Sequence, residues 1–281
     1  MTPRLALVLI AALSVSACSK DETPETVTPP APAATTPTDA AASAPPSDLP
    51  PGSIGPVADL TGLEAGVQYT AVQGGQSLEP LGDKVEVVEV FSYACGACAA
   101  FQPLVNAWKP TLGPDVKFSY VPAGFRDTWQ PYVRAYYTAE ALGLAEKGHD
   151  ALFNAVHVER TLQGERAVDT AEAIGAVYAK QGANAGEFAS TMESFAITAK
   201  ANRALQFVQR NQVNSTPTMI IDGRYIATGK TFEDVLSNTD LLIGRARAAR
   251  RAAAAPAATA VDPASAAAPA VTPTPAPAAT Q

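Results

Sequence analysis

The aromatic residues of this 281-residue chain are confined to its middle, because every Trp, Tyr and Phe lies between Tyr69 and Phe232. Alanine and proline dominate both ends instead. A segment without large apolar side chains cannot bury enough surface to offset the conformational entropy that it loses on ordering. The chain length allows one or two domains, and the folded part is nearer to about 190 residues than to 281.

The net charge and the cysteine count exclude several classes of protein. A formal net charge of -7 argues against nucleic acid as the main partner, since phosphate binding requires a basic face. The chain has only three Cys and two His residues. These numbers are too small for a disulfide-stapled scaffold, a zinc module with several cysteines or an iron–sulfur ferredoxin.

Residues 1–17 have the features of a secretory signal peptide. Arg4 supplies the positive start, and Leu5–Leu13 is an apolar segment that is too short to span a bilayer. Small residues precede Cys18, so the segment resembles the lipobox of bacterial lipoproteins, in which that cysteine is lipidated. The resemblance implies a lipid anchor at Cys18, and Ser19, where an Asp would retain the protein at the inner membrane, slightly favours the outer membrane. A soluble secretory protein with an incidental cysteine is the alternative.

Two segments of low complexity flank the expected fold. Residues 18–58 are rich in Pro, Ala and Thr and are predicted to form a disordered tether, and residues 252–281 are predicted to form a similar tail. Four basic residues precede the tail: Arg245, Arg247, Arg250 and Arg251. They could contact anionic lipid, but a helix whose basic end complements its own dipole is the simpler interpretation.

The hydrophobic pattern predicts an α/β chain with helices in its middle. The expected elements follow one another in this order: strands 67–72 and 85–91, a helix through 101–108, a strand 116–121, helices over 130–211, a hairpin 218–227 and a last helix from Thr231. Such an order indicates an α/β layer fold with a helical insertion.

Cys95 and Cys98 stand where the second strand gives way to the first helix. The unpaired N–H groups and the partial positive charge at a helix start stabilise a thiolate, so the pKa of Cys95 should be lowered. A thiolate is the species that attacks disulfides and leaves from them, and this spacing lets the second sulfur close a small ring. Gly96 permits the tight turn into the helix. The pair is therefore interpreted as redox-active.

Three other interpretations of the cysteine pair remain open. A structural disulfide would close a loop of only four residues, which gains little chain entropy. Half of a zinc site would need further ligands, and His149 and His157 do not have the spacing of a zinc finger. An inert pair in the core is disfavoured by the glycine-containing turn. Both histidines are then interpreted as surface residues or as core residues of the helical insertion.

The residues around the pair resemble those of the DsbA-like thiol:disulfide oxidoreductases of the thioredoxin superfamily. The similarity rests on Phe91-x-Tyr93-x-Cys95-x-x-Cys98 after a β-branched strand, Pro103 in the first helix, Ser215-Thr216-Pro217-Thr218 before a hairpin, and the helical block. It implies an α/β, thioredoxin-like fold with an inserted helical domain. The implied division is a first thioredoxin-like segment at 59–129, the helical insertion at 130–211 and a second thioredoxin-like segment at 212–251.

The resemblance also implies a function and roles for single residues. Cys95 would be the nucleophile and Cys98 the resolving cysteine of a periplasmic enzyme that oxidises exported cysteine-containing proteins. Thr216 and Pro217 would form a cis-proline loop, where the backbone of Thr216 pairs with an extended substrate peptide. A membrane quinone-linked thiol oxidase would recycle the enzyme, which would be a monomer without metal or cofactor.

One departure from the family leaves the direction of exchange open. Gly96-Ala97 stands where DsbA proteins usually carry Pro-His, so no side chain between the cysteines stabilises the thiolate. A weaker oxidant is therefore expected. A disulfide reductase or isomerase that uses the same pair is the first alternative. A non-catalytic, lipid-anchored binding or assembly protein on the same scaffold is the alternative of another class.

Two acidic residues interrupt the strongest strand. Glu86 and Glu89 are three residues apart, so they point to opposite faces and one of them should meet the core. Glu89 matches the buried acid of the family, six residues before Cys95, and would relay protons to or from Cys98. An exposed edge-strand acid is the alternative. Trp129, in the loop that leads into the insertion, is expected to pack in the core or to line a substrate groove.

Overall fold

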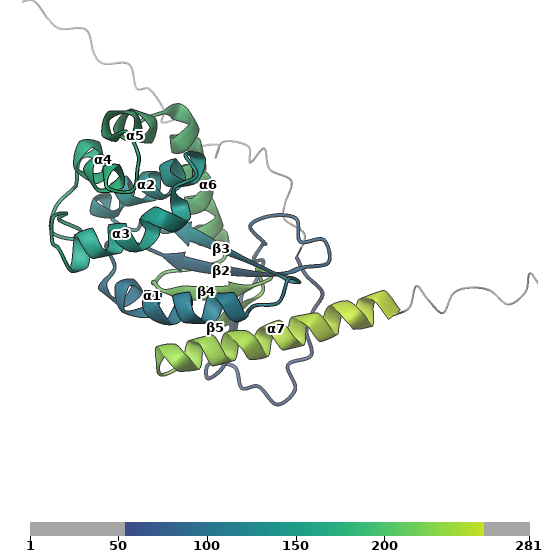
Figure 1. Ribbon diagram of the computed structural model, residues 1–281. Coiled ribbons are helices and arrows are strands. Elements are labelled where there is room, and N and C mark those ends of the chain that lie inside the picture. The colour runs from purple at the N-terminus through teal and green to yellow at the C-terminus, as the bar shows by residue number, and fades with distance from the viewer. Residues whose placement is uncertain (1–53, 256–281) are drawn as a thin grey trace, which may run out of the picture. The chain divides into compact units, whose positions relative to one another are not determined.

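The computed structural model describes residues 54–255 and is shown in Figure 1. Residues 1–17, Cys18, most of the tether at 18–58 and most of the tail at 252–281 lie outside the described residues. The predictions of a signal peptide, a lipid anchor and two disordered segments therefore stay predictions. Within residues 54–255, no helix combines the length and the apolar character that crossing a membrane requires.

A five-stranded sheet in the order β1-β5-β4-β2-β3 forms the middle of the described fold. The strands are β1 (Tyr69–Ala71), β2 (Val85–Phe91), β3 (Val116–Pro122), β4 (Thr218–Ile221) and β5 (Tyr225–Ala227). Strand β2 pairs in parallel with β3 and antiparallel with β4. All seven residues of β2 are buried, which fits the β-branched run that predicts a strand covered on both faces.

Two helices pack on one face of the sheet. Helix α1 (Gly96–Trp108) contains Pro103, and α7 (Phe232–Ala254) starts with a capping box between Thr231 and Asp234. One apolar cluster joins them to the strands, with its larger members Val85, Val87, Phe101, Val105, Trp108, Met219, Ile221, Leu236, Leu242 and Ile243. The side chains of β2 at positions 87 and 89 therefore face α1 and α7.

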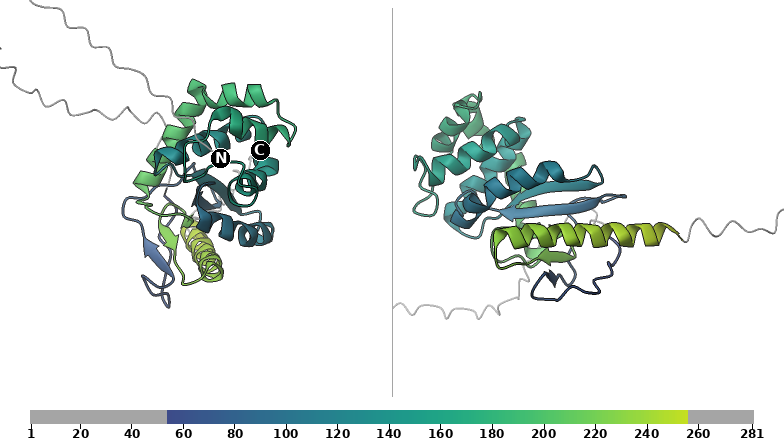
Figure 2. Two further views of the ribbon diagram at one scale, coloured as in Figure 1. Left: turned by 90° about the vertical axis from the view of Figure 1, so that its left-hand side faces the viewer. Right: turned by 60° about the horizontal axis from the view of Figure 1, so that its bottom comes forward.

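A block of five helices follows β3 and gathers at the end of the sheet where β2 leads into α1 (Figures 1 and 2). The short 3-10 helices η1 (Lys109–Thr111) and η2 (Asp127–Trp129) flank β3. The block consists of α2 (Gln130–Ala141), α3 (Ala145–His157), α4 (Ala171–Ala179), α5 (Ala185–Met192) and α6 (Phe195–Arg210). The predicted α/β layer fold with a helical insertion is confirmed.

Residues 158–170 depart from the nearly continuous helix that the sequence predicts between 130 and 211. This segment is a loop that turns around the Asp169 carboxylate. The carboxylate accepts the N–H groups of Gln163 and Gly164 at 2.9 to 3.1 Å and the Tyr132 hydroxyl at 2.5 Å. Hydrogen bonds to one buried carboxylate thus take the place of helical hydrogen bonds in this segment. The periodicity of apolar residues in the sequence does not indicate this change.

Three of the four arginines near the end of α7 have partners within the fold. Arg247 forms a bidentate ion pair with Asp115, and Arg250 forms one with the buried Asp222. Arg245 donates to the carbonyl of Thr61 at 2.8 Å. The sequence interpretation based on the helix dipole does not predict these partners.

Candidate active site

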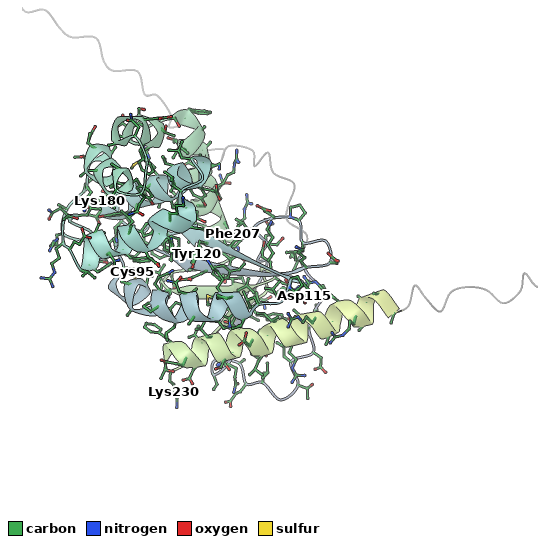
Figure 3. The ribbon with its side chains drawn as sticks, viewed as in Figure 1. Cys95, Asp115, Tyr120, Lys180, Phe207 and Lys230 are labelled. Carbon is green, nitrogen blue, oxygen red and sulfur yellow. The ribbon has the colours of Figure 1, made fainter. Side chains whose placement is uncertain are left out.

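Cys95 lies at the junction between β2 and α1, on the side of the fold where the helical block begins (Figure 3), and Cys98 lies in the first turn of α1. Both are free thiols, and Cys95 is 8% exposed whereas Cys98 has no exposed surface. The Cys95 sulfur occupies the N-cap position of α1 and accepts the N–H of Cys98 at 3.3 Å. Both cysteines are thus buried, and Cys95 is the more accessible of the two.

The Thr216–Pro217 loop lies against the same sulfur, although it is 121 residues away in the sequence. The peptide bond between these two residues is cis. The Cys95 sulfur is 3.5 Å from the carbonyl oxygen of Thr216. Since Pro217 has no N–H group, the loop leaves no unpaired backbone donor at that position next to the sulfur. The antiparallel pairing of β4 with β2 brings the loop to this place.

The surroundings shift the pKa values of the two thiols in opposite directions. The hydrogen bond from the Cys98 thiol, helped by the backbone N–H groups of Cys98 and Ala97, lowers the pKa of Cys95 from 9.0 to about 6, although burial acts in the opposite direction. Burial and the neighbouring Cys95 raise the pKa of Cys98 well above its ordinary value. Near neutral pH the reduced pair therefore holds one thiolate at Cys95 and one protonated thiol at Cys98.

Glu89 is fully buried on the face of β2 that packs against α1. Neither of its carboxylate oxygens has a hydrogen-bond partner among residues 54–255. Burial raises its pKa to about 8; Lys109 acts against this shift, and the charge of Cys95 adds to it. The carboxyl is therefore protonated near neutral pH, and its proton lies in the electrostatic reach of the redox pair.

Glu86 is buried as well, whereas the sequence predicts that only one of the two acids meets the core. The segment before β2 covers the second face, and the N–H groups of Leu78 and Glu79 donate to the Glu86 carboxyl at 2.9 to 3.2 Å. Burial still raises the pKa of Glu86 to about 7. The covering segment has no regular secondary structure, so no periodic pattern indicates it.

Two histidines and a tryptophan complete the surroundings of the pair. His149 is buried and His157 is half-buried, and each contacts Tyr93, two residues before Cys95. Sequence reasoning assigns both histidines to the surface or to the core of the insertion and misses this contact. Trp129 is buried beside the partly exposed Phe125, with ring centroids 5.7 Å apart. Among the described residues, no three His, Cys, Asp or Glu side chains are grouped as metal ligands.

Comparisons with known proteins agree with this geometry. A thioredoxin family model matches residues 83–240. The chain is 33% identical over 192 residues to the thiol:disulfide interchange protein DsbA of Pseudomonas syringae pv. tomato, covering 67% of this chain and 87% of that protein. It is 32% identical over 201 residues to DsbA of Pseudomonas aeruginosa, covering 70% and 92%. The chain belongs to the DsbA family.

Solved structures of DsbA proteins share the fold. The crystal structure of DsbA from Xylella fastidiosa matches with a TM-score of 0.63 and 34% identity, over 66% of this chain and 98% of that one. The crystal structure of Pseudomonas aeruginosa DsbA matches with a TM-score of 0.61 and 31% identity, over 67% and 97%. The expected thioredoxin-like fold with an inserted helical domain and the expected thiol:disulfide oxidoreductase activity are confirmed.

Proposed function

We propose that this DsbA-family protein is a periplasmic disulfide donor that oxidises cysteine-containing exported proteins through Cys95 and Cys98. One observation carries the proposal: the Cys95 sulfur caps the start of α1 with a lowered pKa, beside a second sulfur that is buried and protonated. A thiolate stabilised in this way is a good leaving group and favours the reduced state of the pair. The oxidised pair is therefore disposed to pass its disulfide on.

The exchange proceeds in two steps. A substrate thiolate attacks the Cys95 sulfur of the oxidised pair; the bond between Cys95 and Cys98 breaks, and Cys98 leaves with the electron pair and takes up a proton. A second substrate thiolate then attacks the substrate sulfur of the mixed disulfide, and Cys95 leaves as a thiolate. The substrate gains one disulfide, the protein takes up two electrons, and Cys98 receives one proton.

Glu89 is the proposed source of the proton for Cys98. The raised pKa of Cys98 makes it a poor leaving group unless a proton arrives. Glu89 carries a proton up to about pH 8 and lies on the face of β2 beneath α1. In the reverse direction the carboxylate would accept the proton from Cys98 as the disulfide forms again.

The substrate is proposed to bind as an extended peptide along the loop at Thr216 and Pro217. The Thr216 carbonyl lies 3.5 Å from the sulfur that the substrate attacks. Backbone pairing there would place a substrate cysteine against Cys95 without selecting for its side-chain neighbours. Such a site suits an enzyme that serves many exported proteins. A membrane quinone-linked thiol oxidase would then reoxidise the monomeric enzyme.

We retain the division of the chain at 59–129, 130–211 and 212–251 within this proposal. The first and last segments contribute the sheet with α1 and α7, and the middle segment contributes α2 to α6. The cysteines belong to the first segment and the cis-proline loop to the last one. The redox site thus forms only when the two outer segments pair through β2 and β4.

The direction of exchange can be measured with purified oxidised protein. It should introduce a disulfide into a reduced two-cysteine peptide at a rate proportional to its concentration, and the Cys95→Ser variant should give only the rate without protein. Equilibration with glutathione buffers measures the reduction potential of the pair, which should be more oxidising than that of thioredoxin. Because Gly96-Ala97 adds no charge, the potential should be less oxidising than those of the strongest DsbA proteins. A value near that of thioredoxin would instead assign the protein as a reductase or isomerase.

The lipid anchor is a separate proposal that rests on the sequence around Cys18. Mass spectrometry of the mature protein from its native host should show an N-terminal Cys18 with a mass increase of acyl chains and a diacylglyceryl group. A Cys18→Ser variant should be recovered in the soluble fraction of the cell envelope. An unmodified N-terminal peptide would leave a soluble periplasmic protein and would not affect the redox proposal.

A further inference from the structure

Both histidines of the chain contact the same residue, Tyr93, although they are eight residues apart. The Nδ1 atom of His149 lies 2.8 Å from the Tyr93 hydroxyl oxygen. The Nε2 atom of His157 lies 2.8 Å from the Tyr93 carbonyl oxygen. Since a carbonyl oxygen only accepts, His157 must donate this hydrogen bond through Nε2–H. One residue is thus held at its side chain and at its backbone from a single helix.

A stripe along α3 makes these contacts possible. Positions 149, 153 and 157 are spaced by four residues, so their side chains share one side of the helix. Phe153 fills the space between the histidines, with its ring centroid 5.0 Å from that of Tyr93 and 5.2 Å from that of His149. Tyr93 itself has no exposed surface. The helical block therefore contacts the turn before Cys95 by both ring packing and hydrogen bonds.

The protonation of His149 is fixed by its two partners. Its Nε2 atom lies 3.2 Å from the side-chain oxygen of Gln102, which only accepts, so the proton is on Nε2. Nδ1 then accepts the Tyr93 hydroxyl hydrogen. Burial lowers the pKa of His149 to about 4, so the ring stays neutral near neutral pH and this pattern holds. His149 thereby connects Tyr93 to α1, because Gln102 belongs to that helix.

Tyr93 lies inside the turn that presents the nucleophile. The N–H of Cys95 donates to the carbonyl of Ser92 at 3.1 Å, and the N–H of Ala94 donates to the Ser92 hydroxyl at 3.2 Å. These two bonds close the turn from within but do not tie it to the helical block. The contact from His157 to the Tyr93 carbonyl supplies that tie, two residues before Cys95.

The dipeptide between the cysteines gives this sulfur no side-chain support of its own. Gly96 has no side chain, and Ala97 has no polar group. The position of the Cys95 sulfur relative to the Cys98 N–H and the Thr216 carbonyl therefore depends on the turn that precedes it. A hydrogen bond to sulfur weakens when such a turn shifts by a fraction of an ångström.

We propose that His149 and His157 are positioning residues of the redox site, which hold Tyr93 and through it keep the Cys95 sulfur at the start of α1. This inference rests on the proposed function, because it concerns the same redox site. The ionisation of Cys95 can nevertheless be measured without any substrate. The helical block then contributes to the chemistry as well as covering the site. His157 acts on the backbone of the turn, and His149 acts on the side chain that the turn carries.

The test compares variants by the thiolate absorbance of Cys95 as a function of pH and by equilibration with glutathione. The His157→Ala variant should raise the pKa of Cys95 by about half to one unit and should shift the glutathione equilibrium about three- to tenfold toward a less oxidising pair, because the Cys98 N–H bond loosens. His157→Gln keeps an N–H donor and should restore most of both values. Tyr93→Phe removes the hydroxyl contact with His149 but keeps the backbone carbonyl that His157 contacts, and it should give a smaller shift in the same direction.

An exposed residue of the same helix supplies the control. Asn154→Ala should leave the Cys95 pKa and the glutathione equilibrium unchanged. A merely structural role would lower the free energy of unfolding of His157→Ala and of Tyr93→Phe but leave both redox values as in the wild type, and that result would overturn the proposal. A wild-type protein that titrates as described but does not oxidise peptides would refute the proposed function and leave this inference standing.

Discussion

Of the two cysteines of the redox pair, iodoacetamide should modify only Cys95 in the reduced, folded protein, at a rate that rises with pH around a midpoint near 6. At that pH half of the Cys95 thiol is ionised, whereas an ordinary cysteine with a pKa of 9.0 is ionised to only about 0.1%. The thiolate fraction is thus about 500 times larger at this site. Cys98 is fully covered and its pKa is raised, so it should react only after unfolding.

Timed alkylation between pH 4 and pH 9, followed by mass spectrometry of the two cysteine peptides, measures this profile. The Cys98→Ser variant is the informative control, because the Cys98 thiol is the largest cause of the lowered pKa of Cys95. A serine hydroxyl can still donate to the sulfur, whereas Cys98→Ala cannot. The midpoint should therefore rise more in the alanine variant than in the serine variant. A wild-type midpoint between 8 and 9 would contradict the proposed nucleophile.

The Glu89→Gln variant should be more stable than the wild-type protein at pH 8, by up to about 5 kcal/mol. Folded Glu89 keeps its proton up to about pH 8, whereas the unfolded chain loses it from about pH 4.5. Between these values the unfolded state binds fewer protons than the folded state, so the free energy of unfolding falls as the pH rises. Glutamine has no proton to lose, so the variant escapes this decline.

Urea unfolding of both reduced proteins at pH 4, 6 and 8 tests this expectation. Cys95 acts in the opposite direction, because its lowered pKa gives stability that is lost as the pH falls, but this contribution is common to both proteins and cancels in their difference. The two proteins should be about equally stable at pH 4. Glu64→Gln, at an exposed position, should stay within about 0.5 kcal/mol of the wild type at every pH. A difference for Glu89→Gln that does not change with pH would mean that Glu89 is charged in the fold.

Regular elements and the contacts that follow from them could be predicted from the sequence. The β-branched run of β2 has the same bounds in the structure as in the prediction, and the predicted hairpin 218–227 contains β4 and β5. Thr231 is the N-cap of the last helix, close to the predicted start. The cysteine pair could be recognised as a redox site because, in a chain with three cysteines, few other functions fit the Cys-x-x-Cys spacing. The approach of Thr216 to Cys95 could be expected only through resemblance to a family, since 121 residues separate them.

Contacts that depend on irregular or distant segments could not be predicted. The segment that covers Glu86 donates backbone N–H groups, which any sequence supplies, so its residue types carry no signal. The contacts of His149 and His157 with Tyr93 depend on how α3 packs against the turn after β2. A histidine in an apolar stripe is equally compatible with an ordinary core position. The one signal in the sequence is that His149, Phe153 and His157 recur at every fourth residue, which indicates that they share one side of α3.

The Cys95 sulfur is at once a reactant and the acceptor that closes the first turn of α1. In the reduced protein an anion fills this position, where a helix favours negative charge. When the sulfur enters a disulfide it becomes neutral, and the same N–H groups face a weaker acceptor. Each cycle of oxidation and reduction therefore removes and restores a favourable electrostatic contact at one helix terminus. The fold therefore contributes to the driving force of oxidation, because reduction of the pair restores the thiolate that the N-terminus of α1 stabilises.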